Sequence, residues 1–248
     1  MAGQRAKTCF QEDDPESGVL RRATVEFIGT ALLMLAATGA GLTSHRLFQN
    51  SLGLGLFVNA IATAGSLVAL IFAFGSASGG HFNPLITLLQ WLSGERKLNC
   101  TVAYVAGQFG GAIAGVLMAN GLFQATDTAN DLVTPWALVL SEAVASGSLM
   151  VIVFGCSRSG RKDTGPIAVG LWLAAAILAT PSASYANPAI TFAAFLAEGP
   201  ISLSALAVSL YVPAEILGAL VALAIVAVAY PTSVLPPRAD DLMRATNV

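Results

Sequence analysis

Two Asn-Pro dipeptides, Asn83-Pro84 and Asn187-Pro188, are the residues of this sequence whose types and order point most directly to chemistry. Asparagine is a favoured helix N-cap and proline suits the first helical position, so each dipeptide predicts a helix start. The apolar run after each holds about ten residues, or about 15 Å of helix, half the depth of a membrane core. Two such helices that enter from opposite faces would meet at mid-depth. Their N-termini, each with about half a positive charge, would repel cations, and the two asparagine amides could donate hydrogen bonds to a neutral molecule.

The composition places these helices in a membrane protein. Of 248 residues, 55% are hydrophobic and only 10% are charged, whereas soluble domains carry about 25% charged residues. Apolar stretches of membrane-spanning length recur, and the charges lie between them, a pattern typical of membrane spans. We predict an all-α membrane protein with six transmembrane helices at 24–43, 52–74, 101–123, 136–156, 166–181 and 205–230, and two re-entrant half-helices at 84–93 and 188–197.

The basic residues predict the orientation. Six spans place both termini on one side of the membrane, and that side would receive all the Lys and Arg residues except Arg46. The positive-inside rule therefore predicts that the tails, 1–22 and 231–248, are cytoplasmic. The residues on that side would be Arg5, Lys7, Arg21, Arg22, Arg96, Lys97, Arg158, Arg161, Lys162, Arg238 and Arg244.

The channel domain, 23–230, contains an internal repeat. Glu26 in the first span is echoed by Glu142 in the fourth, and the two Asn-Pro dipeptides occupy matching places. Each repeat (about 23–123 and about 136–230) has three spans, and an odd number inverts one repeat relative to the other. Small residues recur every fourth position in the third and sixth spans, and we expect these two rows to cross each other. The rows are Gly107, Gly111 and Gly115, and Ala214, Gly218 and Ala222.

These motifs resemble the aquaporin (major intrinsic protein) family. The resemblance covers residues 23 to about 230 and implies a channel with an hourglass pore in each protomer, usually assembled as a homotetramer. The motifs that carry it are Glu26-Phe27-Ile28-Gly29-Thr30, His81-Phe82-Asn83-Pro84, Gly107-Gln108, Asn187-Pro188-Ala189, and Pro213 ahead of Gly218-Ala219.

The resemblance also implies roles for residues around the two dipeptides. Glu26 and Glu142 would accept backbone N–H bonds from the two re-entrant loops. Backbone carbonyls along both loops would line the pore as acceptors for the solute. These carbonyls would belong to Gly79, Gly80 and His81, and to Ala183, Ser184 and Tyr185.

Two departures from the family pattern bear on selectivity. Leu85 replaces the alanine that usually follows the first Asn-Pro, and Ile190 replaces the usual arginine after the second Asn-Pro-Ala. By family spacing, Thr63, Ala175 and Ser184 complete the outer constriction with Ile190. This ring is uncharged and built of small and medium side chains, so we expect a filter wider than that of a strict water channel.

The expected cargo is a set of small neutral solutes, water together with glycerol, urea, boric acid or arsenous acid. A related group of bacterial channels with a nonpolar residue in place of this arginine resembles the present pattern. Its members are associated with arsenic efflux, including methylated arsenicals. This resemblance favours trivalent arsenic as cargo and a bacterial inner membrane as the location.

Three other functions compete with this interpretation. The protein could be a strict water channel, a proton- or ion-coupled secondary transporter, or a structural junction with a closed pore. A transporter would use the intramembrane acids Glu26, Glu142 and Glu215 as a proton relay. We favour a structural role for the first two. Glu215 stands where the third span has Gln108, and we expect it to be an uncharged carboxyl at a helix crossing.

The remaining chemistry-bearing residues predict no enzyme, metal site or cofactor. His45 and His81 are isolated, and Cys9, Cys100 and Cys156 are far apart in the sequence. No nucleophile–base pair or phosphate-binding loop is present. The net charge of −2 offers no basic field for nucleic acid.

Overall fold

The computed structural model describes residues 18–125, 136–161 and 163–231. Nearly all of the two predicted cytoplasmic tails lies outside these residues. The described part is helical, with α1 at Val19–Leu47, α2 at Leu52–Ser78, α3 at Pro84–Leu92, α4 at Leu98–Phe123, α5 at Trp136–Arg158, α6 at Gly165–Ala179, α7 at Pro188–Ala194, a 3₁₀ turn η1 at Gly199–Ile201 and α8 at Ala205–Ala229.

Five helices of the described chain, α1, α2, α4, α5 and α8, are long and apolar enough to cross a membrane. The fifth predicted span, 166–181, is α6, a helix of 15 residues. At 1.5 Å per residue it reaches about 22 Å, less than the ~30 Å of a hydrocarbon core. Non-helical backbone continues from Thr180 to Asn187, and α7 begins at the next residue. The fifth span thus ends early because the chain leaves the helix to form the second re-entrant loop.

The half-helices α3 and α7 begin at the two dipeptides, as predicted. Asn83 Oδ1 accepts a hydrogen bond from the Leu85 N–H (2.9 Å), and Asn187 Oδ1 accepts one from Ala189 (3.1 Å). Both helices end before the predicted boundaries, with 9 and 7 residues. At the end of α7 the Leu203 N–H donates to the Ala194 carbonyl, so the following chain satisfies a group that a longer helix would have used.

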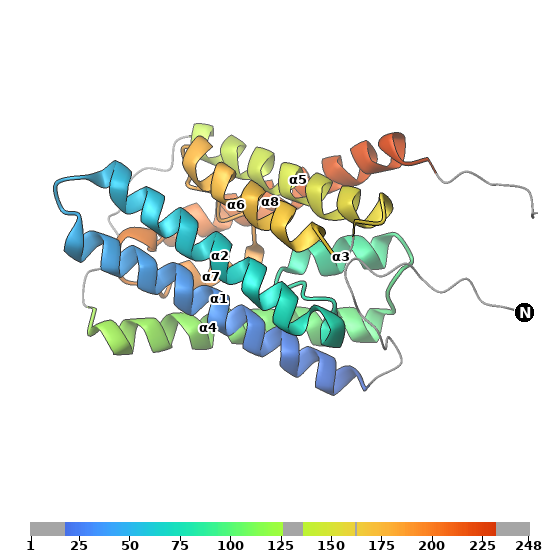
Figure 1. Cartoon of the computed structure of the whole chain (residues 1–248), viewed down its shortest axis with the longest axis horizontal. Coiled ribbons are helices and arrows are strands. Elements are labelled where there is room, and N and C mark those ends of the chain that lie inside the picture. The colour runs from blue at the N-terminus through green and yellow to red at the C-terminus, as the bar shows by residue number, and fades with distance from the viewer. Residues whose placement is uncertain (1–17, 126–135, 162, 232–248) are drawn as a thin grey trace, which may run out of the picture.

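The helices form one bundle, in which α3 and α7 approach the middle from opposite ends (Figure 1). The start of α1 and the end of α8 lie at the same end of the bundle (Figure 1). Within the first repeat α4 packs along α1, and within the second repeat α8 packs along α5 in the same way. Helices α2 and α6 join the two repeats. This arrangement is the inverted three-plus-three repeat predicted from the sequence.

The two rows of small residues do not cross each other, so the prediction of their partner was wrong. A Cβ at Gly111 would lie 2.2 Å from the Phe27 carbonyl oxygen of α1, and one at Gly218 would lie 2.0 Å from the Ala143 carbonyl of α5. Gly107 and Gly115 also face α1 backbone, at 2.7 and 2.2 Å. Each row therefore lets the third helix of a repeat touch the first helix of the same repeat.

Replacing Gly111 with alanine should separate α1 from α4, because the new methyl group has no space against the Phe27 carbonyl. Overpacking of this kind costs about 1–3 kcal/mol, so we expect a lower thermal unfolding midpoint for purified Gly111→Ala. Gly65→Ala is the matched control. Gly65 is a helical glycine with nothing within 4 Å of its Cβ position, and alanine there should be neutral or stabilising. Equal midpoints for the two variants would show that the close approach does not limit stability.

Candidate functional site

The two re-entrant loops are bonded to each other at the centre of the bundle. Asn83 Nδ2 donates to the Ala186 carbonyl (2.9 Å), and Asn187 Nδ2 donates to the Phe82 carbonyl (2.8 Å). Because each Oδ1 caps its own half-helix, the orientation of both amides is fixed. Each Nδ2 has two hydrogens and gives one to the opposite loop, so a second N–H is left for a molecule in the cavity that both asparagines line.

Both loops hold their backbone in the left-handed region. Phe82 and Ala186 each have φ of 47°. The first loop has glycine at two further left-handed positions, Gly79 and Gly80, whereas the second has Ala183 (59°) and Ser184 (52°). A non-glycine residue in this region costs about 1–2 kcal/mol. The second loop therefore requires more support from its surroundings than the first.

Glu26 supports the first loop. Its Oε1 accepts from His81 N–H (3.0 Å) and Ser78 Oγ (2.6 Å). Its Oε2 accepts from Phe82 N–H (2.7 Å) and Gln108 Nε2 (2.8 Å). The side chain has no exposed surface. One buried carboxylate therefore accepts from four donors and fixes the path of the loop.

Glu142 supports the second loop in the same way. Its two oxygens accept from Tyr185 N–H (3.0 Å) and Ala186 N–H (2.8 Å), and it is also bonded to Ser182. The structure thus places Glu26 and Glu142 where the resemblance implied. With the N–H groups turned to these glutamates, the carbonyl groups of the loops are left for the cavity side.

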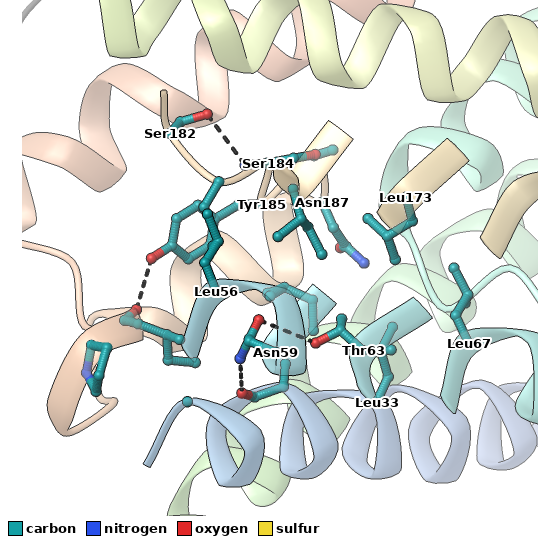
Figure 2. Close-up of a pocket in the computed structure, with 18 of the residues that line it drawn as sticks. Leu33, Leu56, Asn59, Thr63, Leu67, Leu173, Ser182, Ser184, Tyr185 and Asn187 are labelled. Atoms are coloured by element: carbon teal, nitrogen blue, oxygen red, sulfur yellow. Dashed lines mark hydrogen bonds between the residues drawn. The ribbon is translucent and has the colours of Figure 1, made fainter. Parts of the chain in front are cut away.

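A cavity of about 670 Å³ leads from one end of the bundle to the two asparagines. Asn59 and Thr63 lie on its α2 side, and Thr63 Oγ1 is within 3.5 Å of Asn59 Oδ1 (Figure 2). Apolar side chains from α1, α2, α6 and α7 form much of the rest, including Leu33, Leu67, Leu173, Ile177 and Ile190. No Lys, Arg, Asp or Glu is among the described residues that line it.

Three of the four expected filter residues, Thr63, Ser184 and Ile190, line this cavity. Ser184 is 5% exposed, and its Oγ has no hydrogen-bond partner among the residues that the structure describes. The Oγ atom itself is buried, so Ser184 lines the cavity through its other atoms. Ile190 is 8% exposed, so only a small part of its side chain contributes to the wall.

The fourth expected position, Ala175, does not lie with them. Ala175 is exposed on the outer face of α6, between Leu171 (68% exposed) and Leu178 (45%). The side chains that α6 turns toward the cavity are Leu173 and Ile177. Family spacing counted back from Asn187 therefore selected the outer side of the helix, and the cavity-lining residues of α6 nearest that count are Leu173 and Ile177, each two positions away.

The carbonyl positions mostly agree with expectation. Gly80 and His81 line the cavity, as do Ala183, Ser184 and Tyr185, whereas Gly79 is buried outside it. The two residues that follow each asparagine are buried in the packing around the half-helices. They are Pro84 and Leu85 in the first loop, and Pro188 and Ala189 in the second. Leu85 is only 1% exposed and belongs to the core, so this departure from the family affects packing and not the cavity wall.

The imidazole of His81 is held in place by neighbouring side chains. Its Nδ1 is 2.8 Å from Thr87 Oγ1, and its ring packs edge-on against Tyr104, with centroids 5.4 Å apart. The guanidinium carbon of Arg96 lies 4.4 Å from the centre of the same Tyr104 ring. Within the described residues no group of three or more His, Cys, Asp or Glu side chains could hold a metal ion.

The sequence analysis missed several residues that hold the site together. Ser78 and Ser182 bind the supporting glutamates, and Thr87 and Thr191 bind the side chains behind each loop. A signal for all four was present, because each pair is separated by the same number of residues as Asn83 and Asn187. Asn59 had no counterpart in the repeat and was visible only as a polar residue within a span.

Two inverted half-helices that meet around a cavity with uncharged walls, inside a bundle of apolar helices, define a membrane channel for small solutes. Residues 15–186 match the family model for the major intrinsic protein. The chain is 36% identical over 212 residues to the aquaglyceroporin AqpS of Rhizobium meliloti (strain 1021), covering 85% of this chain and 90% of that protein. It is 30% identical over 203 residues to the aquaporin AqpM of Methanothermobacter marburgensis, covering 71% and 82%.

The chain therefore belongs to the major intrinsic protein family. The solved structure of the aquaglyceroporin from Plasmodium falciparum has the same fold, with a TM-score of 0.68, 17% identity, and coverage of 84% of this chain and 95% of that one. The protein is an integral, multi-pass membrane channel for water and small neutral solutes, in a family of channels rather than enzymes.

Glu26→Gln should disrupt the first loop. An amide has one acceptor oxygen, so whichever way the new side chain turns, its NH₂ faces either the His81 and Ser78 donors or the Phe82 and Gln108 donors. Ser78 Oγ can turn to accept and the Gln108 amide can flip, so one backbone N–H, that of His81 or that of Phe82, loses its acceptor. Leaving a buried donor unpaired costs about 1–3 kcal/mol. We expect a lower unfolding midpoint and lower water permeability in proteoliposomes.

Glu95→Gln is the control for this variant. Glu95 is bonded to Arg158 at one end of the bundle, away from both loops, and a glutamine oxygen can keep that bond. Loss of a partly exposed ion pair is worth about 1 kcal/mol or less. If Glu26→Gln were as stable and as permeable as Glu95→Gln, the glutamate would not be the support of the loop.

Proposed function

We propose that this protein is a passive channel with a wide filter that lacks arginine, conducting water together with glycerol-like solutes and neutral metalloid hydroxides such as arsenous acid. The observation that carries the proposal is the wall of the cavity. Its described lining has no Lys, Arg, Asp or Glu, and Ile190 is the lining residue after Asn187-Pro188-Ala189. A path without these charged side chains offers no counter-charge to an ion and admits molecules that need none.

The two kinds of wall favour amphipathic solutes. Thr63 supplies a hydroxyl group, with Asn59 next to it, whereas Ile177 and Ile190 supply only apolar surface. A polyol can place its hydroxyls against the first set and its carbon atoms against the second. A methylated arsenical has the same division between hydroxyl and methyl groups. The relative from Rhizobium meliloti, an aquaglyceroporin by name, supports a solute larger than water.

The positions of the intramembrane acids argue against a coupled transporter. Glu26, Glu142 and Glu215 have no exposed surface, and none of them is among the cavity-lining residues. A proton relay would need carboxyl groups that exchange with water along the path. Solute flux through a passive channel should therefore follow the solute gradient and show no dependence on an imposed proton or sodium gradient.

The proposed setting is a bacterial inner membrane, with a homotetramer of channels and both termini in the cytoplasm. The outer faces of the helices carry many exposed apolar side chains, as a bilayer requires. The start of α1 and the end of α8 lie at one end of the bundle, which agrees with termini on a common side (Figure 1). The bacterial source of the AqpS relative supports the location.

Ile190→Arg should narrow the filter and add a fixed charge to it. We expect uptake of glycerol and arsenous acid by proteoliposomes to fall at least about tenfold, since about 1.4 kcal/mol of added barrier is enough. Water permeability should fall less, because water is smaller and can bond to the guanidinium. Stopped-flow light scattering with all three permeants measures this. An equal loss of all three would mean that Ile190 does not select the cargo.

Ile177→Phe and Ala175→Phe test which α6 residue belongs to the filter. Ile177 lines the cavity, so a phenylalanine there should reduce glycerol uptake several-fold more than water flux. Ala175 lies on the outer face, so the same substitution should leave both rates within about twofold of the unmodified channel. The reverse result, with Ala175→Phe as the blocking variant, would return Ala175 to the filter.

A further inference from the structure

Glu215 is a third buried glutamate for which permeation has no use. It lies on α8, behind the second loop, with no exposed surface. Its Oε1 accepts from the Asn187 N–H (3.2 Å) and from the Thr191 hydroxyl. Among the described residues no donor reaches its Oε2. A fully buried carboxylate oxygen without a donor is costly, so this side of Glu215 needs an explanation.

The side chain of Glu142 interacts with that of Glu215, and a hydrogen bond between the two carboxyl groups would give Glu215 Oε2 its missing partner. Such a bond requires a proton, because carboxylate oxygens only accept. Glu142 already accepts two backbone N–H groups and is bonded to Ser182. Two adjacent carboxyl groups in a buried site do not both ionise. One proton between them satisfies Glu215 Oε2 and removes the repulsion.

The first repeat shows what this proton replaces. There Gln108 occupies the place of Glu215, and its Nε2 donates to Glu26 Oε2 (2.8 Å) and to Thr87 Oγ1 (3.0 Å). Glu215 contacts the corresponding pair, Glu142 and Thr191. The supporting glutamate therefore receives an amide N–H in one repeat. In the second repeat, Glu215 can donate to Glu142 in the same way only if its carboxyl group is protonated and supplies an O–H.

The side chains of Tyr185 and Tyr211 lie next to the two glutamates and are uncharged. Glu142 comes from α5, Tyr185 from the loop and Tyr211 from α8 itself, with the two tyrosine rings 6.0 Å apart. Both tyrosines interact with Glu142 and are neutral as phenols.

We propose that Glu142 and Glu215 hold one proton between them, carried as the Glu215 O–H and donated to Glu142. Glu215 is then a positioning residue for the second loop. It ties Glu142, which holds Tyr185 and Ala186, to the backbone N–H of Asn187. The loop that lacks glycine at its left-handed positions is thus the one fastened by the shared proton. This inference concerns loop support and does not depend on which solutes pass.

Infrared spectroscopy of the protein in proteoliposomes at pH 7 tests where the proton lies. Wild type minus Glu215→Gln should show the carbonyl stretching band of a protonated carboxylic acid. Wild type minus Glu95→Gln should instead show carboxylate bands, since Glu95 is ion-paired with Arg158. Carboxylate bands in the Glu215→Gln difference would overturn the proposal, because both glutamates would then be ionised.

The positioning role is tested separately by rescue. Glu215→Gln keeps an acceptor for Asn187 and Thr191 and an N–H donor for Glu142, so its water permeability and unfolding midpoint should stay within about twofold and a few degrees of wild type. Glu215→Ala removes all three bonds and should lower both. If alanine behaved like glutamine, or if glutamine were as damaging as alanine, Glu215 would not act as a neutral donor.

Discussion

Backbone that leaves the helix at the middle of a membrane must find every hydrogen-bond partner within the protein or in the water-filled path. The two loops before α3 and α7 meet this constraint by separating their polar groups. Their N–H groups face buried glutamates, and their carbonyl groups face the cavity or the asparagine of the opposite loop. The pore is thus the side of the loops that the protein does not satisfy itself. The glutamates, the cross-loop bonds and the cavity are consequences of one requirement.

The two repeats solve this requirement with different residues. The first uses glycine at its left-handed positions and an amide, Gln108, behind Glu26. The second uses Ala183 and Ser184, and has a carboxyl group, Glu215, behind Glu142. Ser184 is also one of the residues that lines the outer part of the cavity. A side chain at this position costs backbone strain that glycine would avoid.

Much of the fold and of the loop network was predictable because the signals are local or repeated. Asn-Pro specifies a helix start through its own caps, and the recurrence of Glu26 as Glu142 specifies the support. What the sequence left undetermined depends on distances between elements. The spacing of Gly107, Gly111 and Gly115 shows a close helix contact but not which helix approaches. The face that α6 turns inward depends on where that helix ends, so counting back from Asn187 reached Ala175 instead of Leu173 or Ile177.

The location of these differences also separates two properties of the channel. Exclusion of cations is proposed to follow from the facing N-termini of α3 and α7 and from the asparagine amides, which both repeats preserve. Admission of larger neutral solutes is proposed to follow from Ile190 and the side chains around it, none of which holds the loops. A family that keeps its central network can therefore vary its cargo at the outer ring, because the energy that maintains the pore and the energy that selects the solute come from different residues.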